Sequence, residues 1–124
     1  MEKDVLFLLK ADFMDGAEGP FFCPDSLPLE GLLGYYPRLR TELDVKYLDF
    51  LRPRKALVQL LGESHQGLPI LLLGEGSAAD VLAVKVSTVN GHRVVQDPVE
   101  IRRYLSAAYR VARPHEPGAT CGVA

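Results

Sequence analysis

Apolar residues along this chain fall into short strand-sized runs and into longer stripes with helical spacing. Residues 5–9 and 68–73 are apolar at almost every position, which is typical of strands buried on both faces in the centre of an α/β sheet. Pro69 stands in the first positions of the second run, where a strand tolerates proline. Residues 44–51 mix apolar and polar positions and predict a further strand between these two.

Three segments carry apolar side chains at the helical spacing i, i+3, i+4, i+7. The first follows Ser26, which is expected to cap its N-terminus. Gly31 weakens this helix by about 1 kcal/mol relative to alanine, so close packing against a neighbour is expected there. The second helix is expected to open at Arg52-Pro53, and the third after its cap Asp97.

The dipeptide Asn90-Gly91 is the strongest hairpin signal in the chain and lies between expected strands at 81–89 and 93–96. Residues 11–22, rich in Asp and Gly, are expected to form a loop. The order is therefore β-α-β-α-β-β-α: an α/β fold with a mixed four-stranded sheet, flanking helices and an extended hairpin between strands 3 and 4. Residues 1–110 form one expected domain, followed by a flexible tail at 111–124.

Composition narrows the class of protein. The chain has 124 residues and a formal net charge of −2, with 48% hydrophobic and 24% charged residues. These values fit one folded domain and exclude a strongly basic nucleic-acid binder and a disordered acidic chain. No apolar run reaches the roughly 20 residues of a membrane helix, and no signal peptide is visible. Cys23 and Cys121 are too few for a disulfide framework, so the cytoplasm is the expected location.

Three stretches carry a resemblance to known families. Phe22-Cys23-Pro24-Asp25-Ser26 resembles a Cys-Pro-x-Ser active-site loop, and Gly67-Leu68-Pro69-Ile70-Leu71 is similar to a cis-proline loop. Gln96-Asp97 resembles the pair that opens the last helix of such domains. Together they resemble the thioredoxin-like superfamily, most closely the glutaredoxins and the N-terminal domain of glutathione transferases. The chain also resembles a small uncharacterised bacterial family of this fold.

The chain departs from these families in ways that limit the activity implied. Residues 11–22 lengthen the loop before Cys23, and residues 74–90 lengthen the connection to the fourth strand. The helical second domain of the transferases, which supplies their electrophile pocket, has no counterpart in this sequence. Glutathione transferase activity is therefore not expected, even if glutathione binds.

The chemistry expected from the resemblance is monothiol exchange at Cys23. A reactive cysteine needs a thiolate at neutral pH, which the unpaired N–H groups of a helix N-terminus favour. Ser26 stands where a second cysteine would close a disulfide, so glutathione or a protein thiol would resolve the intermediate, and Ser26 would donate to the thiolate. The alternative is a buried, inert Cys23 beside two phenylalanines, and the nearby charge of Asp25 opposes a thiolate.

The resemblance also implies a glutathione site. The backbone of Leu68, before a cis Pro69, would hold the peptide portion of glutathione, and Gln96 with Asp97 would hold its γ-glutamyl end. The alternatives to a glutathione site are a trans peptide bond before Pro69 and a purely structural role of Asp97 as a helix cap. Three basic residues are candidates to meet the carboxylates, with solvated surface charge as their alternative: Lys10, Arg52 and Arg54.

Two other functions compete with exchange. A non-catalytic binding or scaffold module of the thioredoxin fold would keep the architecture without the chemistry. Self-association into a homodimer through an apolar surface that includes Phe21 and Phe22 is the third interpretation. The scattered histidines offer no spacing for a metal site, and Cys121 would act as a resolving thiol only if the tail folds back.

Overall fold

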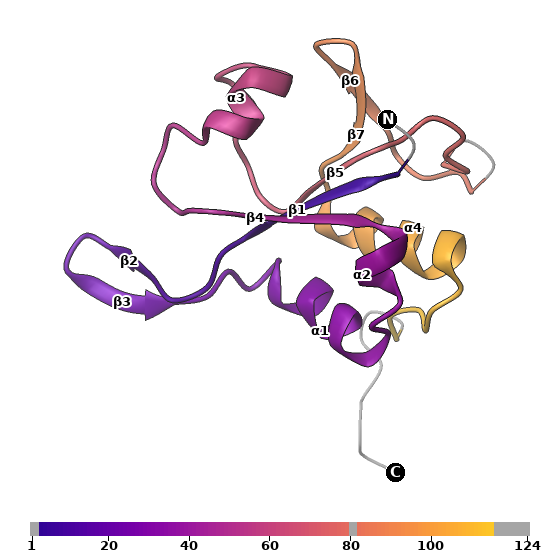
Figure 1. The fold of residues 1–124 in the computed structure, drawn as a ribbon, viewed down its shortest axis with the longest axis horizontal. Helices are drawn as coiled ribbons and strands as arrows, with labels where there is room; N and C mark the ends of the chain where they lie inside the picture. Colours follow the sequence, from indigo (N-terminus) through magenta and orange to yellow (C-terminus); the bar gives the residue numbers. More distant parts are fainter. Residues whose placement is uncertain (1–2, 80–81, 116–124) are drawn as a thin grey trace.

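The computed structural model describes residues 3–79 and 82–115 and shows a mixed α/β protein built on one five-stranded sheet (Figure 1). The strand order across this sheet is β4-β1-β5-β7-β6. Its strands are β1 (Val5–Leu9), β4 (Asp44–Leu48), β5 (Ile70–Leu72), β6 (Ser87–Val89) and β7 (His92–Val95). A separate hairpin consists of β2 (Phe13–Asp15) and β3 (Glu18–Phe21). The helices are α1 (Leu27–Tyr35), α2 (Leu39–Glu42), α3 (Lys55–Leu61) and α4 (Pro98–Tyr109).

Strand β1 lies inside the sheet, with a neighbour on each side. It runs parallel to β4, with Val5 opposite Asp44, and antiparallel to β5, with Val5 opposite Leu72. Its first four residues are buried, as the continuous apolar run predicts. The parallel pair β1 and β4 needs a crossover connection, which α1 and α2 supply.

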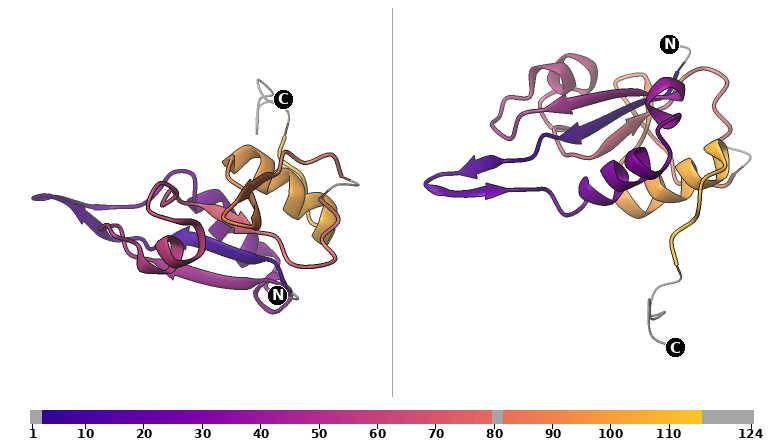
Figure 2. Two further views of the ribbon diagram at one scale, coloured as in Figure 1. Left: turned by 90° about the horizontal axis from the view of Figure 1, so that it is seen from above. Right: turned by 60° about the horizontal axis from the view of Figure 1, so that its bottom comes forward.

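Helices cover both faces of the sheet, so the fold has three layers (Figure 2). Leu6 and Leu8 of β1 pack in one buried cluster with residues of α1, α2 and α4, such as Leu33 and Leu105. Val5 and Phe7 point to the other face, where they pack with α3 residues such as Leu57. Successive residues of β1 thus alternate between two cores, which is why the strand carries no polar position.

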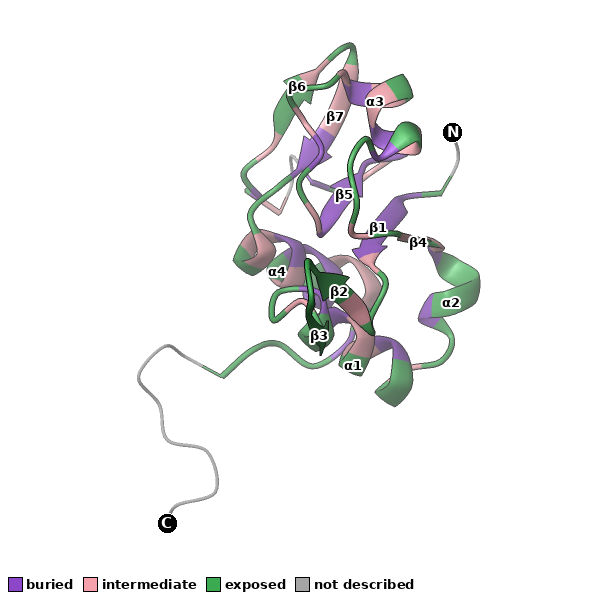
Figure 3. Cartoon of the chain, turned by 90° about the vertical axis from the view of Figure 1, so that its left-hand side faces the viewer, coloured by how far each residue is buried: buried purple, intermediate pink, exposed green. Residues whose placement is uncertain are grey.

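The hairpin β2–β3 projects beyond the sheet and its helices (Figures 1 and 2). Most of its residues are exposed, whereas the central strands of the sheet are buried (Figure 3). Its aromatic anchor is Phe13, which stacks on Phe50 at 4.4 Å between ring centroids and 11° between planes. Phe21 of the opposite strand lies 5.9 Å from Phe13. The aromatic contacts fix the base of the hairpin against the chain that follows β4.

Several expectations hold and several need correction. The hairpin at Asn90-Gly91 is confirmed, with positive φ at both residues, and Asp97 caps α4 by accepting from the amide of Val99 at 2.9 Å. The segment 11–22 forms a hairpin rather than a loop, and α2 was not expected. The sheet has five strands rather than four, because Ser87–Val89 of segment 81–89 pairs with β7 and adds an edge strand. The second helix begins at Lys55 rather than at Arg52-Pro53.

A buried carboxylate joins the start of β1 to α4. Asp4 is 5% exposed, and its Oδ2 accepts hydrogen bonds from the hydroxyls of Tyr104 at 2.6 Å and Tyr109 at 2.7 Å. Its Oδ1 accepts from the amide of Gly74 at 2.7 Å. Burial, and then the bond to Asp4, raise the pKa of Tyr104 to about 12, and the same causes raise the pKa of Tyr109. The carboxylate therefore ties α4 and the end of β5 to β1.

Gly31→Ala is expected to stabilise the protein. Close packing at Gly31 is not found: a Cβ built there would meet nothing within 4 Å, and the position is exposed in the middle of α1. The free energy of unfolding in urea should rise by about 0.5–1 kcal/mol, because alanine loses less backbone entropy in a helix. Gly62→Ala is the control and should give no gain, since Gly62 has a φ of +93°. A loss of stability in Gly31→Ala would contradict the finding that a Cβ at position 31 has open space around it.

The two tyrosines on Asp4 are expected to make stability fall above pH 10. The folded state holds the Tyr104 proton up to about pH 12, whereas the unfolded chain releases it near its ordinary value of 10. Between these values the folded state binds more protons, so unfolding becomes easier by about 1.4 kcal/mol per pH unit for each such tyrosine. Urea unfolding at pH 9–11 should show a shallower decline in Tyr104→Phe. An equal decline in both proteins would show that Tyr104 does not carry this dependence.

Candidate functional site

Cys23 lies in the turn that leads from the hairpin into α1. The amide of Leu27 donates to the carbonyl of Cys23 at 3.1 Å, and the amide of Glu30 donates to that of Ser26 at 3.0 Å. The carbonyl of Cys23 is therefore the first acceptor of helix-type hydrogen bonding, and its donor is the amide four residues later. The side chain of Cys23 is half-buried. The backbone of Cys23 thus lies just before α1, at the end of the helix where N–H groups unpaired within the helix gather.

Ser26 has a different role from the cap that its residue type predicts. It adopts helical angles, makes no side-chain cap bond, and is 4% exposed. Its Oγ accepts a hydrogen bond from the amide of Leu9 at 3.2 Å. The hydroxyl therefore joins the beginning of α1 to the end of β1. This bond fixes the turn that carries Cys23 to the central strand of the sheet.

One pocket, of about 400 Å³, lies at the proline loop before β5. Its lining residues are Asp25, Ser64, His65, Gly67, Leu68, Pro69, Ile70, Gln96 and Pro98. The Leu68-Pro69 peptide bond is cis, as expected. The structure thus brings three of the proposed glutathione residues, Leu68, Pro69 and Gln96, to one pocket. Asp97 does not line it, and its carboxylate caps α4.

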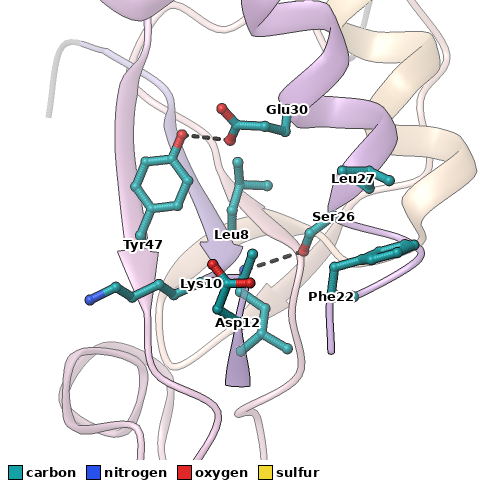
Figure 4. A pocket seen from close by; sticks show the side chains of 11 residues that line it. Leu8, Lys10, Asp12, Phe22, Ser26, Leu27, Glu30 and Tyr47 are labelled. Atoms are coloured by element: carbon teal, nitrogen blue, oxygen red, sulfur yellow. Dashed lines mark hydrogen bonds between the residues drawn. The ribbon is translucent and has the colours of Figure 1, made fainter. Parts of the chain in front are cut away.

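A second pocket, of about 380 Å³, contains Cys23 and shares no lining residue with the first (Figure 4). Its lining residues are Leu8, Leu9, Lys10, Ala11, Asp12, Phe22, Cys23, Ser26, Leu27, Glu30 and Tyr47. Cys23 and the proposed Ser26 and Lys10 are therefore together, on a side of the turn that does not line the Pro69 pocket. We call this space the Cys23 pocket and the other the Pro69 pocket.

Hydrogen bonds join three polar side chains at the edge of the Cys23 pocket. Tyr47 donates to Glu30 at 2.6 Å, and Arg40 donates to Glu30 at 2.6 Å and to the Tyr47 hydroxyl at 3.1 Å. Burial, and then the bond to Glu30, raise the pKa of Tyr47, while the bonds to Tyr47 and Glu30 raise that of Arg40. Sequence analysis missed this group. In the sequence, Tyr47 appeared only as one position of the predicted strand 44–51.

Arg54 lines neither pocket and is 8% exposed. Its guanidinium donates to three backbone carbonyls, of Gln66 at 2.6 Å, Phe50 at 2.7 Å and Asp49 at 3.2 Å. Burial, and then the charge of Arg52, lower the pKa of Arg54, whereas the charge of Cys23 acts in the opposite direction. The guanidinium therefore lies within electrostatic reach of the thiol, while its donors hold the loop after β4.

Neither a metal-binding group of side chains nor a membrane-spanning helix is found among the residues described. Within residues 3–79 and 82–115, no group of three His, Cys, Asp or Glu side chains is arranged to hold a metal ion. In the same ranges, no helix combines the length and apolarity that crossing a bilayer requires. Cys121, the proposed resolving thiol, lies outside the described residues.

The fold and site define a three-layer α/β protein with a half-buried cysteine at the start of a helix, between two pockets. Residues 3–113 match the family described as "Protein of unknown function (DUF3088)", and the chain belongs to this family. No curated protein matches the chain, and no solved structure does.

Arg54→Met is expected to cost about 2–4 kcal/mol of unfolding free energy, measured by urea denaturation. The substitution keeps the aliphatic stem but leaves three carbonyl oxygens without their donor, two of them partly buried and one buried. Arg52→Met is the matched control on an exposed neighbour and should change stability by less than about 0.5 kcal/mol. Equal stabilities of the two variants would show that the carbonyl contacts of Arg54 are dispensable.

Proposed function

We propose that this protein is a thioredoxin-like thiol protein in which Cys23 exchanges disulfides with glutathione or a protein thiol. The architecture supports this proposal. Without the hairpin, α2 and the edge strand β6, the remaining elements follow the order β-α-β-α-β-β-α. This is the order expected for the thioredoxin-like superfamily. The hairpin and β6 fall within residues 11–22 and 74–90, where the sequence departs from that superfamily, whereas α2 lies between α1 and β4.

The observation that carries the proposal is the placement of the Cys23 turn. Asp25, two residues after the cysteine, lines the Pro69 pocket with Leu68 and Gln96. The turn that presents the thiol therefore also forms a wall of the pocket that would hold glutathione. The turn also leads into the N-terminal end of α1, where N–H groups that are unpaired within the helix favour an anion.

The proposed exchange uses one cysteine. The Cys23 thiolate attacks one sulfur of a mixed disulfide, and a new disulfide forms as the old bond breaks. The released sulfur leaves with the electron pair and takes a proton from solvent. A second thiol, glutathione, then attacks the Cys23 disulfide and restores the thiolate. Ser26 closes no disulfide, and its Oγ holds the turn through Leu9.

A non-catalytic module of the same fold is the second candidate, and three placements favour it. Cys23 itself does not line the Pro69 pocket. Asp97 is engaged as the cap of α4, and the guanidinium of Arg54 is engaged by backbone carbonyls. In this alternative the Pro69 pocket binds an extended peptide, and the thiol has no turnover.

The test is the reactivity of Cys23 in a Cys121→Ser background. Iodoacetamide should alkylate Cys23 at pH 6.5 several-fold faster than it alkylates free glutathione, because a helix N-terminus raises the thiolate fraction. Oxidised glutathione should form a mixed disulfide seen by mass spectrometry and reversed by dithiothreitol. The Cys23→Ser, Cys121→Ser double variant is the control and should show neither reaction. Slower alkylation than glutathione, together with no adduct, would favour the non-catalytic module.

A further inference from the structure

The Cys23 pocket has apolar walls beside the thiol. Leu8 of β1 lies at its centre, and Phe22 and Leu27 lie on the side of α1 (Figure 4). Phe22 and Leu27 are 55% and 48% exposed, so both present apolar surface to a ligand. The volume of about 380 Å³ is at the small end of the range of small-molecule sites, roughly 300–1,000 Å³. The pocket therefore fits a group about the size of a phenyl ring or a branched alkyl chain.

On the side of the pocket lined by Phe22 and Leu27, a negative side-chain charge has no positive partner within the part of the chain that the structure describes. Glu30 is paired with Arg40 and bonded to Tyr47. The amino group of Lys10 points away from Phe22 and Leu27 (Figure 4). Asp12 makes no side-chain hydrogen bond or ion pair with the described residues. An ammonium group next to the apolar walls would therefore meet an unpaired carboxylate.

The hairpin holds Asp12 in this position. Asp12 has a φ of 64°, a conformation that Asp and Asn tolerate better than most residues. Its amide donates to the carbonyl of Phe21 at 2.9 Å, and the next residue, Phe13, stacks on Phe50. The hairpin base therefore holds the backbone of Asp12 beside the pocket, and its exposed side chain lines one wall. Residues 11–22 contribute a charged group that a short loop would not supply.

We propose that the Cys23 pocket binds a small organic cation with an apolar body, with its ammonium at Asp12 and its apolar group against Phe22 and Leu27. The substrate class is the disulfide of an aminothiol. This second step rests on the proposed exchange: the thiolate of Cys23 bonds to one sulfur, the S–S bond breaks, and the leaving aminothiolate takes a proton from solvent. Glutathione stays assigned to the Pro69 pocket, because Leu68, Pro69 and Gln96 line it.

Binding is tested with two probes of similar size and opposite charge, phenethylammonium and 3-phenylpropionate. Titrations followed by the methyl NMR signals of Leu8 and Leu27 should show the cation bound at least about tenfold more tightly. Asp12→Asn, which keeps a residue suited to positive φ, should remove most of this preference. Asp15→Asn removes the same charge from the hairpin outside the pocket lining and should leave it intact. Equal binding of both probes, or equal effects of both substitutions, would overturn the proposal.

The reaction is tested with three disulfides: cystamine, 2-hydroxyethyl disulfide and 3,3′-dithiodipropionate. In the Cys121→Ser background, Cys23 should be modified fastest by the cation cystamine, more slowly by neutral 2-hydroxyethyl disulfide, and slowest by the anion 3,3′-dithiodipropionate. Asp12→Asn should reduce the differences between these three rates. If all three react at one rate and neither probe is preferred, the cation site is wrong and exchange at Cys23 stands. If none reacts but phenethylammonium is preferred, the cation site stands and the proposed exchange fails.

Discussion

The apolar side chains of β1 need cover on both faces of the sheet, and this constraint places most of the other elements. Leu6 and Leu8 are covered by α1 and α4, and Val5 and Phe7 by α3. Each such side chain contributes about 1.5–3 kcal/mol when fully buried. A sheet with one solvated face would expose half of this run, so helices must pack on both sides. The three-layer arrangement follows from five consecutive residues.

Polar bonds at the two ends of β1 then determine where the site lies. Before the strand, Asp4 binds α4 through Tyr104 and Tyr109. At its last residue, the amide of Leu9 binds Ser26, and so the turn of Cys23 is attached to a buried interior strand. A site fixed to a rigid strand is held more precisely than one carried by a free loop. The Cys23 turn therefore keeps its orientation although the preceding hairpin projects from the body.

Local signals made much of the fold predictable, whereas contacts distant in sequence did not. The Asn90-Gly91 turn and the Asp97 cap act within a few residues, so residue type alone identifies them. The hairpin at 11–22 lacks an alternating apolar pattern, and its anchor is the stacking of Phe13 on Phe50, 37 positions away. At the site, the resemblance to the thioredoxin-like superfamily grouped Leu68, Pro69 and Gln96, and these residues line one pocket. Sequence analysis mistook Ser26 for a cap, because its actual partner, Leu9, belongs to another element.

The turn before α1 contributes residues to two pockets. Asp25 lines the Pro69 pocket and Cys23 lines the other. In the proposed exchange, the group attached to the attacked sulfur approaches through the Cys23 pocket. The proposed glutathione site and the proposed substrate site therefore lie in separate pockets, so the two thiols of the proposed exchange would not compete for one site.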